Sequence, residues 1–157
     1  MSHQLVPVPM RSKVLDILGH LSRDLVRFLD SLRNWLSATG RQIGDVALTA
    51  QSAAITTTDV PATTLDGTLY RASYSLRITQ AATTSSSAQL TLGWTSDSVS
   101  CAQTFAAVTG NTTATQQSDV IVIAADSATT VTYAVAYSST GATSMTYALD
   151  IRLEVLP

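Results

Sequence analysis

The sequence predicts a mainly β protein: an antiparallel, jelly-roll-like β-sandwich of seven or eight strands, preceded by one long amphipathic N-terminal helix. Near the start of the chain, apolar residues recur at alternating spacings of four and three, the pattern of a helix with one apolar face. From about residue 46 the apolar period changes to two, as in half-buried strands. Clusters of turn-forming residues separate these strands at regular intervals, which is typical of all-β sandwiches.

Residues 1–10, with the sequence MSHQLVPVPM, are predicted to form an extended N-terminal arm. Pro7 and Pro9 alternate with Val6 and Val8, and proline both fixes φ and lacks the backbone donor that a helix needs. The residue before each proline is biased towards extended backbone as well. Such a segment needs a partner to become ordered, and we expect a neighbouring subunit to supply it.

The helix is predicted over residues 11–38, with Ser12 as its N-cap and Gly40 just beyond its end. Its apolar seam runs through three heptads without interruption, with leucine at every a position. We predict that this seam mediates oligomerisation or anchoring. The seam residues are Val14, Leu18, Leu21, Leu25, Phe28, Leu32 and Trp35.

The apolar face of this helix is wider than a two-stranded coiled coil requires, because Leu15, Leu29 and Leu36 occupy the neighbouring e positions. A three-stranded stem, or a helix that lies on a larger protein, fits this width better. Burying the seam side chains contributes on the order of 10–20 kcal/mol before chain entropy is subtracted, which is enough to organise an oligomer. A membrane-surface helix is disfavoured, since acidic residues are interleaved along the polar face.

Residues 39–45 are predicted to be a linker and residues 46–157 to be the β-sandwich domain. Four segments alternate apolar and polar residues most clearly: 70–79, 90–95, 131–137 and 145–155. Weaker strands are predicted over 47–55, 99–106 and 120–124. Turn signals rich in Asp, Gly, Ser and Thr lie between the strands.

Charge is sparse and unevenly spread along the chain. Residues 1–41 carry six Lys and Arg against three Asp, a net +3, whereas residues 42–157 carry three against eight, a net −5. A charge of +3 around a helix is too small for a nucleic-acid site, which needs a dense basic patch. The sequence therefore predicts two modules and no nucleic-acid partner.

The β-forming part offers no pair of residues for nucleophilic catalysis. It has no histidine and no lysine, since His3, His20 and Lys13 all precede it. This excludes Ser-His-Asp, Cys-His, Schiff-base and histidine-based metal chemistry there. Cys101 is the sole cysteine, expected to be a small buried apolar residue. We predict that the chain is not an enzyme and has no catalytic residue, cofactor or metal.

Five aspartates are expected to cap turns or strand ends, where this residue is favoured. The alternatives are a carboxylate pair of the glycosidase kind, or a calcium site built from two or three of them. The positions of these aspartates at turns and strand ends disfavour the carboxylate pair, and no aspartate-rich loop supports the calcium site. The aspartates are Asp59, Asp66, Asp97, Asp119 and Asp126.

Residues 55–95, ITTTDVPATTLDGTLYRASYSLRITQAATTSSSAQLTLGWT, contain a turn, a Gly-x-Leu-Tyr entry at 67–70, an alternating strand, a Ser/Thr loop and a Gly-Trp pair. This stretch resembles small structural proteins of tailed phages and prophages, in which such a pattern opens a trimeric jelly-roll head. Jelly rolls of the tumour-necrosis-factor and complement type share the Gly-x-Tyr entry. The resemblance covers mainly residues 46–155 and implies a virion accessory role, as a capsid decoration, a head fibre or a tail-fibre tip, without catalytic residues.

These observations predict a homotrimeric virion protein, made in the host cytoplasm without a signal peptide. Its arm and helix would dock on another virion component, such as a capsid, neck or tail protein, and its sandwich would project outward. The alternative is a tail-fibre tip or a receptor-binding module for a host surface glycan. Loops 80–87 and 138–144 hold no aromatic residue, and Trp94 is in phase with the core residues Leu90 and Leu92, so a sugar platform is disfavoured.

Overall fold

The computed structural model describes Leu25, Leu29, residues 41–62 and residues 69–156. The chain divides into two units, Met1–Thr39 and Gly40–Pro157. In the first unit, Leu25 and Leu29 have helical backbone and are 57% and 53% exposed. The arm and the other seam residues lie outside the described residues, so the helix over 11–38 stays a prediction.

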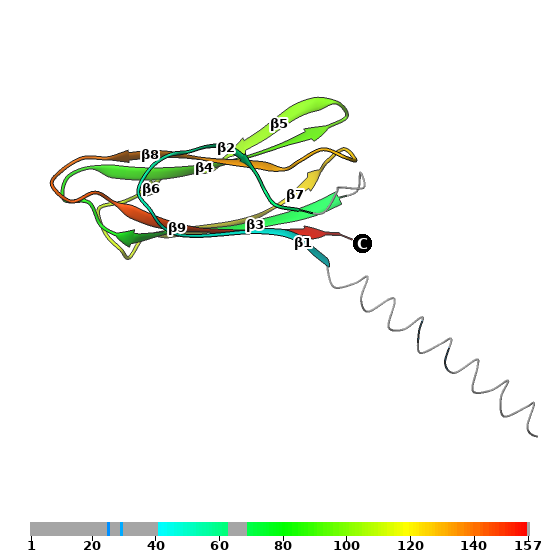
Figure 1. Ribbon diagram of the computed structural model, residues 1–157, viewed down its shortest axis with the longest axis horizontal. Helices are drawn as coiled ribbons and strands as arrows, with labels where there is room; N and C mark the ends of the chain where they lie inside the picture. The colour runs from blue at the N-terminus through cyan, green and yellow to red at the C-terminus, as the bar shows by residue number, and fades with distance from the viewer. Residues whose placement is uncertain (1–24, 26–28, 30–40, 63–68, 157) are drawn as a thin grey trace, which may run out of the picture. The chain divides into compact units, whose positions relative to one another are not determined.

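The second unit is a sandwich of two antiparallel sheets (Figure 1), which confirms the predicted mainly β class. The four-stranded sheet has the order β1-β9-β3-β7, and the five-stranded sheet has the order β2-β8-β4-β5 with β6 beside β4. Among the described residues the strands are β1 (Arg41–Gln51), β2 (Ile55–Asp59), β3 (Leu69–Gln80), β4 (Ser86–Ser96), β5 (Val99–Thr104), β6 (Val108–Thr109), β7 (Gln116–Ala124), β8 (Thr132–Ser139) and β9 (Thr146–Val155).

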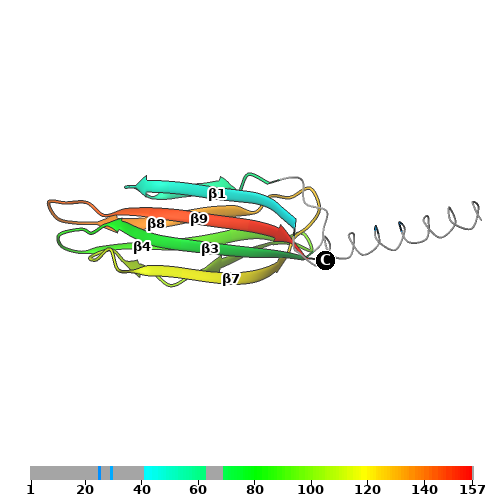
Figure 2. The same ribbon diagram turned by 90° about the horizontal axis from the view of Figure 1, so that it is seen from below.

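The strand pairing is that of one long hairpin rolled into two layers. β1 pairs with β9, β2 with β8, β3 with β7 and β4 with β5, as in a single antiparallel hairpin. Two further pairings, β3 with β9 and β4 with β8, join these ribbons into the two sheets. This is the connectivity of a jelly roll. Figure 2 shows the order β1, β9, β3, β7 across the four-stranded sheet.

Alternation of side chains fills the space between the sheets. Every second residue of β3 and β9 points inward, as their sequence pattern predicts. The four clearest predicted strands are present as β3, β4, β8 and β9. The largest fully buried side chains come from both sheets: Tyr70, Leu76, Ile78, Leu90, Leu92, Ile123, Val131, Met145, Tyr147, Leu149, Ile151 and Leu153.

The domain begins earlier than predicted, because residues 41–45, expected to be linker, form the start of β1. Gly44 lies inside this strand, where a Cβ would come within 2.6 Å of the Pro61 carbonyl oxygen and 2.8 Å of the Ala62 Cβ. Glycine is required at this position by close backbone approach. The strand predicted over 47–55 is divided as well, since its halves belong to β1 and β2 in different sheets.

The hairpin of β4 and β5 is closed by a two-residue turn, Asp97 and Ser98. Both residues have left-handed backbone, with φ of 52° and 63°, as a type I′ hairpin turn requires. The carboxylate of Asp126 closes the turn from across the loop, since it accepts the N–H of Asp97 and the N–H of Ser98 at 2.8 Å each. The predicted turn position of Asp97 and the predicted capping role of Asp126 are confirmed.

Two substitutions at this turn are expected to act in opposite directions. Ser98→Gly should raise the free energy of unfolding by about 1 kcal/mol, because glycine adopts positive φ without steric cost. Asp126→Ala should lower it by about 2 kcal/mol, because two charge-assisted hydrogen bonds are lost. Urea denaturation followed by circular dichroism measures both. A destabilised Ser98→Gly variant would contradict the backbone argument.

Candidate functional site

The described carboxylates serve local structure. Asp59 accepts a hydrogen bond from the Thr130 hydroxyl at 3.2 Å, and Asp119 accepts the N–H of Val120 at 2.7 Å. Asp119 lies within β7 and not at a turn, because continuous pairing with β3 runs past it. Asp66 lies outside the described residues. In residues 41–62 and 69–156, no group of three or more His, Cys, Asp or Glu side chains could hold a metal ion.

Among the described residues, no helix has both the length and the apolar character that crossing a membrane requires.

The outer face of the four-stranded sheet carries alternating charges. Asp150, Arg152 and Glu154 follow one another on this face of β9. The Arg71 guanidinium forms an ion pair with Glu154, with its Nε 2.7 Å from Oε2, and Asp45 of β1 stands opposite Arg152. Short serine side chains leave a hollow of about 440 Å³ between these charges. It is lined by Ser73, Tyr74, Ser75, Asp150 and Arg152.

Towards β7 the same face becomes apolar. Val120 and Val122 are 54% and 60% exposed, and Leu69 of β3 is 51% exposed. Leu69 stands opposite Ala124 in the β3–β7 register, so these side chains are neighbours along the sheet edge. We call Leu69, Val120, Val122 and Ala124 the β7 strip. An exposed group of large apolar side chains at a sheet edge is a candidate contact surface.

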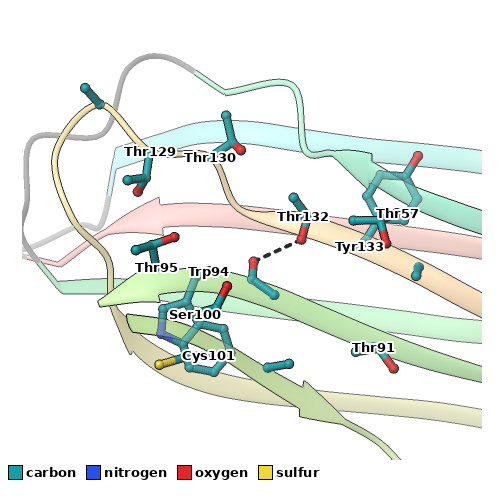
Figure 3. A pocket seen from close by; sticks show the side chains of 14 residues that line it. Thr57, Thr91, Trp94, Thr95, Ser100, Cys101, Thr129, Thr130, Thr132 and Tyr133 are labelled. Carbon is teal, nitrogen blue, oxygen red and sulfur yellow. Dashed lines mark hydrogen bonds between the residues drawn. The ribbon is translucent and has the colours of Figure 1, made fainter. Parts of the chain in front are cut away.

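A second hollow, of about 580 Å³, lies on the five-stranded sheet (Figure 3). Gly93 lies where a Cβ would come within 2.7 Å of the Thr132 hydroxyl, which donates to the Gly93 carbonyl oxygen. Trp94 borders the hollow while packing against the core, as predicted, and Cys101 is half-buried where full burial was expected. The lining residues that carry a hydroxyl group are Thr57, Thr91, Thr95, Ser100, Thr129, Thr130, Thr132 and Tyr133.

The lining of the hollow beside Gly93 is polar but uncharged. It holds hydroxyl, methyl, phenol, indole and thiol groups and no charged side chain. Cys101 lies on β5, an edge strand with mostly exposed residues, which accounts for its partial exposure. The hollow can therefore accept and donate neutral hydrogen bonds but offers no base to activate a hydroxyl.

Loops 80–87 and 138–144 meet at the end of the sandwich where β3 ends and β9 begins (Figure 2). The N–H of Thr140 donates to the Ser85 carbonyl at 2.8 Å, and that of Thr83 donates to Thr143 at 3.3 Å. Gly141 has a φ of +112°, which favours glycine, and a Cβ there would clash with Thr83. The loops 80–87 and 138–144 thus form one hydrogen-bonded, hydroxyl-rich tip.

The buried tyrosines are neutral structural groups. Tyr147 is fully buried and donates to the Ala53 carbonyl oxygen at 2.8 Å. Burial raises the pKa of Tyr147 to about 12, and Tyr137 and Tyr133 add to the shift. Burial also raises the pKa of Tyr74, with a further contribution from the charge of Asp119. None of these hydroxyls is positioned to act as a base near neutral pH.

The raised pKa of Tyr147 predicts a loss of stability in alkali. The neutral form is favoured in the folded state, so its contribution is complete below pH 10, the ordinary tyrosine value, and is lost as pH rises towards 12. Tyr147→Phe should cost about 1 kcal/mol at neutral pH, from the lost hydrogen bond, yet decline less between pH 10 and 12. Urea titrations across this range test it. Parallel pH curves for the two proteins would contradict the argument.

Of the predicted seam, the structure describes Leu25 alone, exposed and helical. It neither brings the seam residues together nor separates them, so their role stays a prediction. The β7 strip was missed, although the run of Val and Ile at 120–123 was visible in the sequence. The hollow beside Gly93 was missed too, although a glycine within a strand pattern is a signal of close approach or a bulge.

Comparison with known proteins gives few matches. No family model matches the sequence, and no curated protein matches it. A chain in the structure of infectious bursal disease virus, Gt strain, is similar with 15% identity and a TM-score of 0.46, covering 76% of this chain and 34% of that one. A chain in the structure of the Gx strain is similar with 14% identity and a TM-score of 0.47, covering 74% of this chain and 33% of that one. This chain thus spans about a third of the length of those chains.

Proposed function

We propose that this chain is a structural protein of a bacteriophage virion, a homotrimeric capsid decoration or head fibre. The observation that carries the proposal is the exposure of Leu25 and Leu29, which are 57% and 53% accessible on helical backbone. Residues four apart lie on the same face of a helix, so these two leucines form part of one apolar surface. Such a surface needs a partner, and further copies of the helix supply one.

The β-sandwich supports the same proposal. Its rolled-hairpin connectivity agrees with the jelly-roll head that the resemblance of residues 55–95 implies. Its tip is closed by hydrogen bonds between hydroxyl-rich loops, which makes it a compact, neutral outer end. In the proposed virion protein, residues 1–38 anchor the trimer on a capsid, neck or tail protein, and the sandwich faces outward.

The trimer is tested by the solution mass of the full chain and of residues 41–157, measured by light scattering. The shorter chain begins at Arg41 because a cut at residue 46 would remove part of β1. We expect three times 16.5 kDa for the full chain and a monomer for the shorter one. A full-length monomer would overturn the trimer. Absence of the chain from purified particles of its source phage would overturn the virion location.

A receptor-binding or glycan-binding module is the second candidate, and the hydroxyl-lined hollow beside Trp94, away from the loop tip, favours it. A neutral sugar is recognised by hydroxyl hydrogen bonds and an aromatic surface, and this hollow contains both kinds of group. A glycan array with the full chain tests this function. Saturable binding that is lost in Thr91→Val/Thr95→Val, while Thr79→Val elsewhere on the surface keeps it, would establish the module.

A further inference from the structure

The outer edge of β7 is open. β7 pairs with β3 over nine residue pairs, and no other strand of the described residues pairs with it. The Ile78 N–H donates to the Thr115 carbonyl oxygen, so in this register the odd-numbered residues of β7 bond to β3 and Val120 faces the other way. The N–H of Val120 donates to the side chain of Asp119. Because backbone groups alternate in direction along a strand, Val122 also directs its N–H and C=O away from β3. This edge therefore presents a row of backbone groups that another strand could pair with.

The side chains along this edge are apolar on both faces of the sheet, which favours pairing with another apolar strand. Val120 and Val122 face outward and are more than half exposed. Ile123 faces inward and is buried, with Ile121 packed at the margin of the core. Four consecutive β-branched apolar residues at an open edge favour the addition of an extended apolar segment.

The chain itself contains a segment with the complementary pattern, at residues 4–10. Residues 5–10 are all apolar, and this segment carries no charged side chain. Pro7 and Pro9 stand two residues apart, so in an extended strand both would face the same side. Val6 and Val8 would then direct their N–H and C=O groups to the opposite side. Such a strand can pair along one edge only, because proline has no N–H for the other.

We infer that residues 4–10 of a second copy of this chain add as a further strand to the open edge of β7. Val6 and Val8 donate to and accept from the edge groups of β7, and Pro7 and Pro9 terminate the enlarged sheet. The apolar side chains of the added strand cover the β7 strip on one face and extend the core margin beside Ile121 on the other. The added strand replaces Asp119 as the acceptor for the Val120 N–H.

The length of the predicted helix indicates that the added strand comes from a second copy of the chain. Residues 11–38 predict a helix of about 42 Å, at 1.5 Å per residue. The distance from β1 to β7 across three strand spacings is only about 14 Å. Val120 stands in one row with Asp45 of β1 across the sheet, so these two residues lie much closer together than the two ends of a straight helix of that length. Residues 4–10 therefore reach a β7 edge on a neighbouring copy gathered by the seam and not on their own chain. The inference needs an oligomer but not a phage particle, so it goes beyond the proposed function.

Hydrogen exchange on the full chain tests the pairing. We expect the amide of Val122 to exchange at least tenfold more slowly in the natural chain than in Val6→Pro/Val8→Pro, which loses the donors facing β7. The matched control is Pro7→Ala/Pro9→Ala, which changes only the side of the added strand that faces away from β7. In this variant the amide of Val122 should exchange as slowly as in the natural chain. The amide of Leu149, inside the sheet, reports that the domain is folded. Equal exchange of Val122 in the natural chain and the Val→Pro variant would overturn the inference.

Cross-linking identifies the occupant. In a Cys101→Ser background, Val8→Cys is combined with Val120→Cys or with Val122→Cys, since partners on adjacent strands lie within disulfide reach. We expect oxidation to give linked chains of two or more subunits, and the control pair Val8→Cys with Thr57→Cys on β2 to stay unlinked. A disulfide within one chain, or no disulfide at either β7 position, would overturn the inference that the added strand comes from a second copy. A trimer that persists without cross-links would leave the proposed function standing and remove this inference alone.

Discussion

Replacing Leu149 by alanine is expected to lower the free energy of unfolding by about 3–5 kcal/mol. Leu149 is fully buried on β9, where it stands between Leu48 of β1 and Leu76 of β3. Its truncation leaves a cavity among strands that are paired on both sides and cannot move inward freely. Since small domains are stable by only about 5–15 kcal/mol, this single change should remove a large part of the total.

Urea denaturation followed by circular dichroism measures this loss, as a lower midpoint with an unchanged slope. The control is Val99→Ala on β5, where the side chain is 61% exposed and little packing is lost. That control should change the free energy of unfolding by less than about 1 kcal/mol. A similar small effect of Leu149→Ala would mean that β9 is not packed in the centre of the core.

If the chain is the proposed trimer, the seam substitution Leu32→Asp is expected to convert it into a monomer. Leu32 occupies an a position, so in a three-stranded stem three carboxylates would be buried in one layer without partners. The matched control is Asn34→Asp, which adds the same charge at a c position on the outer side of the helix. Light scattering should give 16.5 kDa for Leu32→Asp and three times that mass for Asn34→Asp.

Loss of the trimer in both variants would point to general charge repulsion in the helix. Retention of the trimer in both would show that the sandwich, and not the seam, gathers the subunits. Only the difference between the two variants supports a stem with Leu32 inside it.

The strands that sequence predicted best are those with two faces in different surroundings. β3 and β9 separate the core from solvent along their whole length, so their alternation is nearly perfect. The pattern predicts a single strand over 47–55, where the structure has parts of β1 and β2, because residues 50–54 carry no glycine or proline to mark the break. In the structure Ala50 adopts a φ of 53° at this point. A non-glycine residue with positive φ is set by the surrounding fold, which local pattern does not record.

Gly44 led to the opposite error, because a residue of strand β1 was predicted to belong to a linker. It suggested a bend in a linker, whereas it permits the backbone at Pro61 and Ala62 to approach β1. Residue propensity predicts a turn or strand end at Asp119, but pairing of β7 with β3 on both sides of it keeps it in a strand. In both cases a contact between distant parts of the chain decides the conformation.

The candidate surfaces were less predictable than the fold. Each loop of the tip was recognisable as a loop, but the bonds that join Thr83 to Thr143 depend on how the hairpin is rolled. The hollow beside Gly93 likewise needs three adjacent strands, β4, β5 and β8, which come together only in the finished sheet. Sequence could name the side chains but not their neighbours.

The rolled hairpin also governs how the domain can fold. Its most local pairing is the β4–β5 hairpin, joined by Asp97 and Ser98, while Arg41 must find Val155 at the other end of the domain. We therefore expect closure to proceed outward from β4–β5 and to end with β9 inserting between β1 and β3, on the millisecond-to-second scale typical of such non-local pairing. Stopped-flow tryptophan fluorescence can time it. Until β9 arrives, β1 and β3 present open edges, so we expect the unfinished chain to aggregate more readily than the finished one.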